Sequence, residues 1–114
     1  MLTPEERQLL ELQAQICQVL SSPKRLEVLY TLKNRELTAG ELAVALETSP
    51  PNLSQHLAMM RKVGVVAARK EGSNTYYRIA IPHVLDACKV VREVLSLSIA
   101  QQRAVLEGAG VRNE

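Results

Sequence analysis

The sequence has few of the features that mark secreted or membrane-spanning proteins. It contains two cysteines in 114 residues, and they do not form a C-x-x-C pair, so a disulfide framework is excluded. No apolar run approaches the roughly 20 residues of a membrane span. Residues 1–21 have charges spread through them, unlike a signal peptide. We therefore expect a cytoplasmic protein, kept reduced, with no membrane partner.

Catalytic motifs are also missing. There is no nucleophile elbow, phosphate-binding loop or H-E-x-x-H sequence, and no pair of carboxylates stands in a recognisable catalytic setting. We expect neither an enzyme nor a cofactor. The chain is long enough for one hydrophobic core, and it has no repeat, linker or low-complexity tract. Residues 1–114 are therefore predicted to form one domain.

What the sequence does contain is a well-delimited helix within residues 49–66. Ser49 can cap it by accepting a hydrogen bond from an early backbone N–H, and Pro50 suits its first position. Gly64 can end it in the left-handed conformation. Apolar residues recur on one face at helical spacing: Leu53, Leu57 and Met60. This face should be buried.

The opposite face of this helix carries small polar side chains and no bulky apolar group at its N-terminal end. Such a surface suits entry into a groove of DNA. The candidates for contacts there are Ser49, Asn52, Ser54 and Gln55. His56 lies between the two faces, and it either contacts a phosphate or forms a hydrogen bond within the protein.

A second short helix precedes this one. Residues 38–41 form a capping box that opens it, with Leu42, Ala45 and Leu46 predicted to face inward. Residues 47–49 then leave a three-residue turn. Two short helices joined by such a turn are typical of a helix-turn-helix, whose second helix enters the major groove.

After Gly64 the sequence predicts a β-hairpin. Two β-prone runs, residues 65–70 and 75–81, flank a glycine-containing loop at residues 71–74. Three residues alternate with more polar neighbours and predict one buried face: Tyr77, Ile79 and Ile81. A basic hairpin directly after a helix-turn-helix is a wing that contacts the DNA backbone or the minor groove.

Positive charge concentrates in this part of the chain. The formal net charge is only +2. Residues 49–78, however, carry five cations against the single carboxylate of Glu71, a local charge of +4. This distribution favours a phosphate-binding surface and a double-stranded DNA partner. The candidate backbone contacts are Arg61, Lys62, Arg69, Lys70, Asn74 and Arg78.

Three further helices are predicted. A capping box at residues 3–6 opens a first helix to about Leu20, Ser22-Pro23 opens a second, and Pro82 opens a last helix to about Glu107. The first and last carry more apolar surface than a monomer should expose, so we expect a homodimer. The expected dimer residues are Leu9, Leu12, Ile16, Val84, Cys88, Val91 and Leu95. The fold class is mainly α with a small β-hairpin wing, or α+β: a five-helix winged helix-turn-helix.

Four segments together resemble the ArsR/SmtB family of bacterial winged-helix repressors. They are residues 19–26, 38–43, 53–66 and 72–78, and the resemblance covers about residues 16–95. It implies a dimer formed through the first and last helices. It also implies binding to an imperfect palindrome as a repressor, with release when an effector binds.

The metal sites of well-known family members are not retained. Arsenic and cadmium sensors carry E-L-C-x-C-x-L on the third helix, whereas this chain has Ala43 and Ala45 in place of the cysteines. Zinc sensors place four ligands on the last helix. Here those positions are Ile81, His83, Val94 and Leu97. One imidazole does not make a zinc site, so no metal is expected.

The effector is therefore open. Persulfide and disulfide sensors of the family have cysteines where this chain has Tyr30 and Ser96. Cys17 and Cys88, on the first and last helices, could form a redox switch, or Cys88 could be a small, inert, buried residue. A small-molecule effector is an alternative. A further alternative is a winged helix that binds proteins and not DNA, although a basic wing favours DNA.

Overall fold

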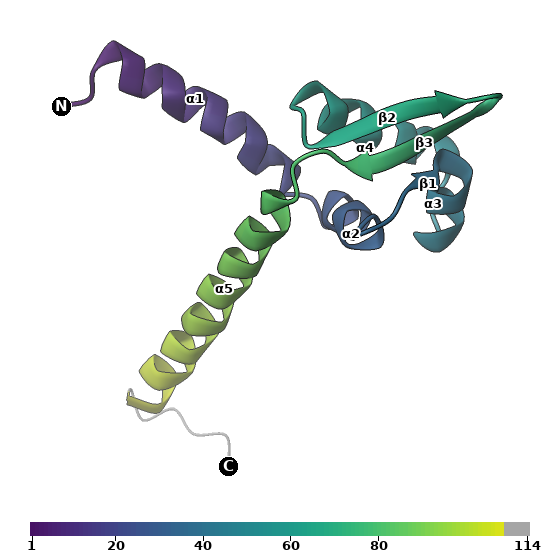
Figure 1. Ribbon diagram of the computed structural model, residues 1–114. Coiled ribbons are helices and arrows are strands. Elements are labelled where there is room, and N and C mark those ends of the chain that lie inside the picture. Colours follow the sequence, from purple (N-terminus) through teal and green to yellow (C-terminus); the bar gives the residue numbers. More distant parts are fainter. Residues whose placement is uncertain (109–114) are drawn as a thin grey trace. The chain divides into compact units, whose positions relative to one another are not determined.

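The computed structural model describes residues 1–108, and the chain divides into two compact units at Pro82. The first contains α1 (Pro4–Val19), α2 (Pro23–Thr31), β1 (Leu37–Thr38), α3 (Ala39–Ala45), α4 (Pro50–Lys62), β2 (Val66–Glu71) and β3 (Asn74–Ile79). The second contains α5 (His83–Gly108). Figure 1 shows these helices and the hairpin of β2 and β3. The predicted fold class is confirmed, whereas the single domain stays a prediction.

Side-chain caps fix where the helices of the first unit begin. Thr3 Oγ1 accepts from the N–H of Glu6 at 3.1 Å, and the Glu6 carboxylate accepts from the N–H of Thr3 at 3.1 Å. Thr38 and Glu41 form the same box at 3.1 and 2.9 Å. Each box satisfies backbone donors that have no partner inside the helix.

The core of the first unit lies among the end of α1, the helices α2, α3 and α4, and residues 65–66 at the start of β2. Its largest fully buried side chains are Val19, Val28, Leu29, Leu32, Leu42, Leu53, Leu57, Met60 and Val65. One prediction for α3 is wrong, because Ala45 is exposed and Ala43 is buried. The buried side of this short helix is centred between Leu42 and Ala43, so Ala45 turns to solvent.

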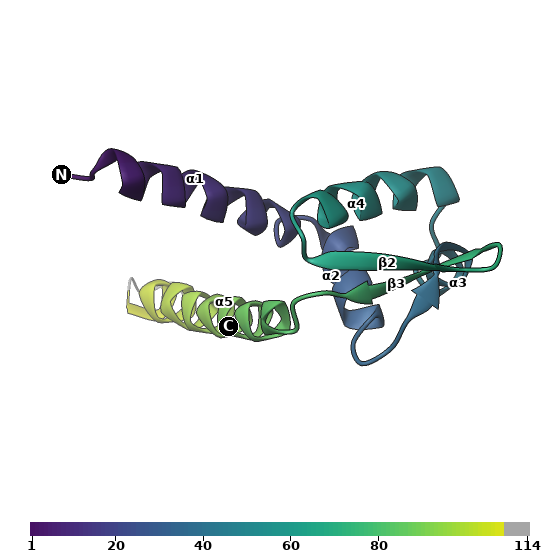
Figure 2. The same cartoon turned by 45° about the horizontal axis from the view of Figure 1, so that its top comes forward.

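The three strands form an antiparallel sheet in the order β1-β3-β2. Val66 pairs with Ile79, Arg69 with Tyr76, and Leu37 of β1 with Tyr77. The turn between β2 and β3 extends beyond α4 (Figures 1 and 2). Gly72 adopts φ +62° in this turn, a conformation that favours glycine.

The expectation of a fully buried hairpin face is met only in part. Val66 is buried and Tyr77 and Ile79 are half-buried, but Ile81 is exposed. Ile81 is exposed because β3 ends at Ile79, so the alternation of faces does not reach it. Tyr76, on the other face, is also half-buried.

α1 and α5 differ from the other helices in their exposure. Val19 is the only buried residue of α1, and Val84 and Cys88 are the only buried residues in the described part of α5. The remaining apolar residues predicted to form a dimer are exposed: Leu9, Leu12, Ile16, Val91 and Leu95. No helix within residues 1–108 is long and apolar enough to cross a membrane.

Candidate nucleic-acid interface

The turn between α3 and α4 presents the N-terminal end of α4. Glu47 takes a positive φ of 50°, and the N–H of Thr48 donates to the carbonyl oxygen of Ala43 at 3.1 Å. The apolar face of α4 packs into the core, which leaves the opposite face to solvent. The predicted contact residues on it are exposed: Ser49, Asn52, Ser54 and Gln55. This arrangement is a helix-turn-helix with an accessible second helix.

The backbone at the start of α4 offers few hydrogen-bond donors. Pro50 and Pro51 have no N–H, and the next two N–H groups donate to Ser49, from Asn52 to Oγ at 3.4 Å and from Leu53 to the carbonyl oxygen at 3.1 Å. Helix N-termini often bind phosphate through such groups. Here polar contacts must come from side chains.

Asn52 is held in a defined orientation. Its Nδ2 donates to Thr48 Oγ1 at 3.0 Å. Within residues 1–108, Oδ1 and the second Nδ2 hydrogen form no further hydrogen bond, which leaves an acceptor and donor pair that suits an adenine edge. Thr48 was not among the sequence candidates. Its position four residues before Asn52, at the entry to a helix, was the available signal.

His56 forms a hydrogen bond within the protein, one of the two alternatives that the sequence left open. Its Nδ1 lies 3.3 Å from Nη1 of Arg25, whose Nη2 donates to the carbonyl oxygen of Gln18 at 2.7 Å. Guanidinium groups only donate, so Nδ1 accepts and the ring proton is on Nε2. Burial, and then the charges of Arg25 and Lys24, lower the pKa of His56.

The cations of the wing fall on two faces of the sheet. Side chains alternate along β2, so Arg69 shares a face with Ala67, and Lys70 shares the other with the buried Val66. Arg78 lies on the face of Arg69, because it pairs with Ala67. The sequence had grouped Arg69, Lys70 and Arg78 together, since it does not reveal the register.

Arg69 is surrounded by carboxylates. Its Nε donates to the two oxygens of Glu36 at 2.9 and 3.0 Å, Nη2 lies 2.9 Å from Glu36 Oε1, and Nη1 donates to Glu71 at 2.6 Å. The guanidinium carbon lies 4.7 Å from the centre of the Tyr76 ring. The hydrogen bonds from Arg69 lower the pKa of Glu36. Glu36 was not among the sequence candidates.

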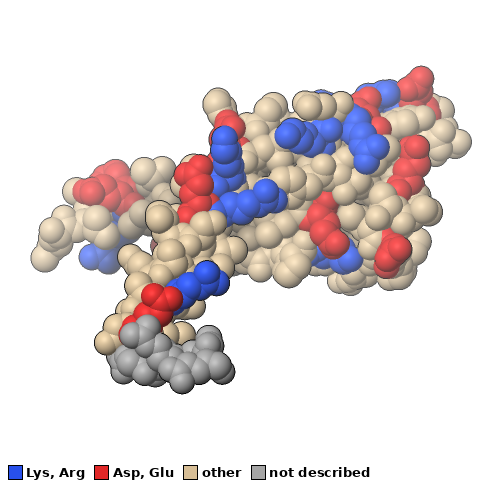
Figure 3. Space-filling model, turned by 90° about the horizontal axis from the view of Figure 1, so that it is seen from below, with Lys and Arg blue, Asp and Glu red and all other residues tan. Residues whose placement is uncertain are grey.

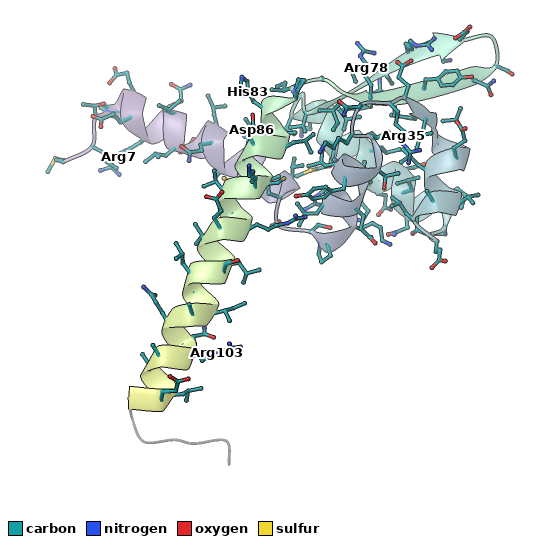
Figure 4. All side chains as sticks on the ribbon, turned by 60° about the horizontal axis from the view of Figure 1, so that its bottom comes forward. Arg7, Arg35, Arg78, His83, Asp86 and Arg103 are labelled. Carbon is teal, nitrogen blue, oxygen red and sulfur yellow. The ribbon has the colours of Figure 1, made fainter. Side chains whose placement is uncertain are left out.

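The other cations differ in how they are paired. Arg78 lies on β3 (Figure 4), and its Nη1 is 4.0 Å from Glu36 Oε2. Within residues 1–108, Arg61, Lys62 and Lys70 have no ion-pair partner. Figure 3 shows Lys and Arg atoms alternating with Asp and Glu atoms, so the face in that view has no continuous basic patch.

The residues considered for metal or redox chemistry belong to α1 and α5. His83 is exposed in the first turn of α5, 3.1 Å from Asp86 (Figure 4). No group of three or more His, Cys, Asp or Glu side chains that could hold a metal ion occurs among the described residues. Cys17 is exposed, and Cys88 is buried with its thiol pKa raised by burial. They belong to the two separate units, so their pairing stays a prediction.

Comparison with known proteins identifies the family. A family model described as "Bacterial regulatory protein, arsR family" matches residues 22–68. The HTH-type transcriptional regulator Rv0081 of Mycobacterium tuberculosis is 40% identical over 106 residues, which cover 90% of this chain and 91% of the relative. The chain belongs to the ArsR family. It is therefore a DNA-binding transcriptional regulator and not an enzyme, as predicted.

Two further relatives resemble this ArsR-family regulator. The arsenical resistance operon repressor of Escherichia coli is 30% identical over 101 residues, covering 87% of this chain and 86% of the repressor. The solution structure of Mb0332 from Mycobacterium bovis, a homodimeric winged helix-turn-helix DNA-binding domain, matches with a TM-score of 0.75 and 27% identity. That match covers 88% of this chain and 93% of the other. The crystal structure of Rv0081 matches with a TM-score of 0.72.

Proposed function

We propose that this ArsR-family regulator is a repressor that binds a pseudo-palindromic DNA operator as a homodimer. The observation that carries the proposal is the outer face of α4. Asn52, Ser54 and Gln55 are exposed there, and Asn52 is already oriented by Thr48. Small uncharged donors and acceptors at the start of a second helix suit base edges in the major groove.

The dimer is supported by the exposed apolar surface of α1 and α5. Leu9 is 64% exposed, Val91 56% and Leu95 57%. A soluble monomer rarely exposes this much apolar surface on its helices, and a second copy of the same helices would cover it. The relative Mb0332 is itself homodimeric. A two-fold dimer would place its two α4 helices about 34 Å apart, one turn of DNA, and so requires a pseudo-palindromic site.

DNA contacts divide by chemistry in this proposal. Asn52, Ser54 and Gln55 contact base edges, whereas Ser49 and the exposed cations contact the sugar-phosphate backbone. The backbone contacts we propose are Arg61, Lys62, Lys70, Asn74 and Arg78. His56 supports α4 from inside through Arg25. Arg69 is not among these backbone contacts, because its guanidinium donates to the carboxylates of Glu36 and Glu71.

Repression is proposed because the Escherichia coli relative is a repressor. A dimer bound across a promoter would block transcription. Such a regulator acts where the chromosome is, in the cytoplasm.

We propose a redox or small-molecule effector in place of a metal. Ala43 and Ala45 stand where arsenic sensors have thiolates, so the third helix offers no soft-metal ligand.

The deciding experiment is selection of bound sequences from random duplex DNA, followed by a gel shift with the winning site. We expect an inverted repeat whose half-site centres are one turn apart, bound by two chains. Asn52→Ala should remove the preference at one base pair of each half-site. If no sequence is enriched and salt abolishes all binding equally, the alternative of a protein-interaction module is favoured.

A further inference from the structure

One face of the wing sheet carries a connected group of charged contacts. We call it the Glu36 cluster: Glu36, Arg69, Glu71, Tyr76 and Arg78. Extending the pairing of Leu37 with Tyr77 by one residue places Glu36 beside Arg78, in agreement with their 4.0 Å separation. Arg69 reaches Glu36 from β2, on the far side of β3. One carboxylate thus links the segment before β1 to both strands of the hairpin.

The geometry of Arg69 leaves its guanidinium little capacity for DNA. Nε, Nη1 and Nη2 all donate to carboxylates at 2.6–3.0 Å, and the guanidinium carbon lies over the Tyr76 ring. Pairs in which arginine donates two bonds to one carboxylate are directional and stronger than single surface ion pairs. A phosphate would have to displace Glu36 or Glu71 to form a pair of bonds with this guanidinium. Lys70 needs no such exchange, because it is exposed and has no ion-pair partner within residues 1–108.

We propose that Glu36 and Arg69 are positioning residues of the wing, and that Lys70 is the cation of β2 that contacts phosphate. The proposal rests on the proposed function, since it assigns roles within DNA binding. Arg69 holds β2 against the segment before β1 and so fixes the angle at which the hairpin leaves the body of the first unit. Lys70, on the opposite face, then reaches the DNA backbone from a fixed wing.

The test is operator affinity across a salt series for Arg69→Ala and Lys70→Ala, with Lys33→Ala as a control that removes an exposed cation outside the wing. Each phosphate contact contributes about 0.9 to the log–log salt slope. Lys70→Ala should lower the slope by about 0.9. Arg69→Ala should match Lys33→Ala in slope and still bind roughly three- to tenfold more weakly at every salt concentration, because the wing is less well fixed.

A second measurement tests the positioning role without DNA. Amide hydrogen exchange in β1, β2 and β3 should be faster in Arg69→Ala and in Glu36→Gln than in the wild type. The double variant should accelerate exchange by less than the sum of the two single effects, because both single variants remove the Glu36–Arg69 contact. Glu27→Gln, which removes a carboxylate on α2, should leave the exchange of the sheet unchanged.

Two results would overturn the proposal. The first is an Arg69→Ala slope that falls as far as that of Lys70→Ala, which would make Arg69 a phosphate contact. The second is a Lys70→Ala slope equal to that of the Lys33→Ala control. Failure of the proposed function looks different, because the wild-type protein would then bind no operator, while hydrogen exchange would still report whether Glu36 and Arg69 hold the sheet.

Discussion

The apolar residues of α1 and α5, the helices proposed to form the dimer, differ in solvent exposure from those of α2, α3 and α4. In α2, α3 and α4 the apolar positions at helical spacing are buried, as in Leu29, Leu42 and Leu57. In α1 and α5 the equivalent positions are mostly exposed, as in Leu9 and Leu95. The first arrangement is complete within one chain. We propose that a further copy of the chain completes the second.

The largest effect is expected from Val91→Glu on α5. Val91 is 56% exposed in the single chain, and we propose that it is buried between subunits. A carboxylate there would be buried without a partner, at a cost of about 3–5 kcal/mol in the free energy of dimerisation. Sedimentation at micromolar concentration should show monomers, and operator binding should be lost. Circular dichroism should show that α2–α4 still fold.

A control on the same helix sharpens this comparison. Lys89→Glu also introduces a carboxylate on α5, at an exposed charged position, and should leave the dimer intact. The prediction fails if wild-type protein sediments as a monomer, or if Val91→Glu remains dimeric.

The second-largest effect is expected in the core formed within one chain by α2, α3 and α4. Leu29 is fully buried in α2, and Leu29→Ala should lower the free energy of unfolding by about 2–5 kcal/mol through lost burial and the cavity left behind. Urea denaturation measures it. Val44 is 79% exposed on α3, so Val44→Ala should change the same quantity by less than about 0.5 kcal/mol. Equal losses in the two variants would contradict the assignment of the core.

A smaller effect is expected on the recognition surface. Gln55→Ala should cost about 1–3 kcal/mol of operator binding and relax the preference at one base pair. The stability of the protein should not change, since Gln55 is exposed. Ala58→Ser, also on the exposed side of α4 but one turn further from its N-terminus, serves as the comparison. Uniform loss on every DNA sequence would show that Gln55 contacts the backbone and not a base.

Much of the fold could be predicted because its signals are local. Capping boxes at Thr3 and Thr38 and the proline after Ser49 mark helix starts within four residues of sequence, and the structure places α1, α3 and α4 there. Ala45 was misassigned because a seven-residue helix contains too few turns to fix its buried side.

The details of the candidate site were harder to predict because they depend on register and on long-range contacts. Glu36 and Arg69 are 33 residues apart, and Arg25 and His56 are 31 apart. No spacing rule links such pairs. The sequence therefore indicated that the wing is basic without showing that a carboxylate from before β1 holds one of its arginines.

The smallest effect we predict is the pH dependence of stability that arises from His56. Its pKa in the folded protein is lowered by burial and by the charges of Arg25 and Lys24. Between that lowered pKa and the ordinary value of about 6.5, the unfolded chain binds more protons than the folded one. The free energy of unfolding should therefore be fully retained above about pH 6.5 and should fall as the pH drops through that range.

Urea denaturation at pH 7.5 and 5.5 measures this contribution in proteins that carry His83→Asn, so that His56 is the one remaining histidine. His56→Asn is the informative variant, because an amide oxygen near the position of Nδ1 can still accept from Arg25 but does not take up a proton in this range. It should lose the part of the pH dependence that His56 contributes. At pH 5.5 the carboxylate of Glu36, whose pKa Arg69 lowers, stays ionised in both proteins, so the wing does not contribute to the difference. An identical change in stability with and without His56 would show that protonation of this imidazole does not disturb its bond to Arg25.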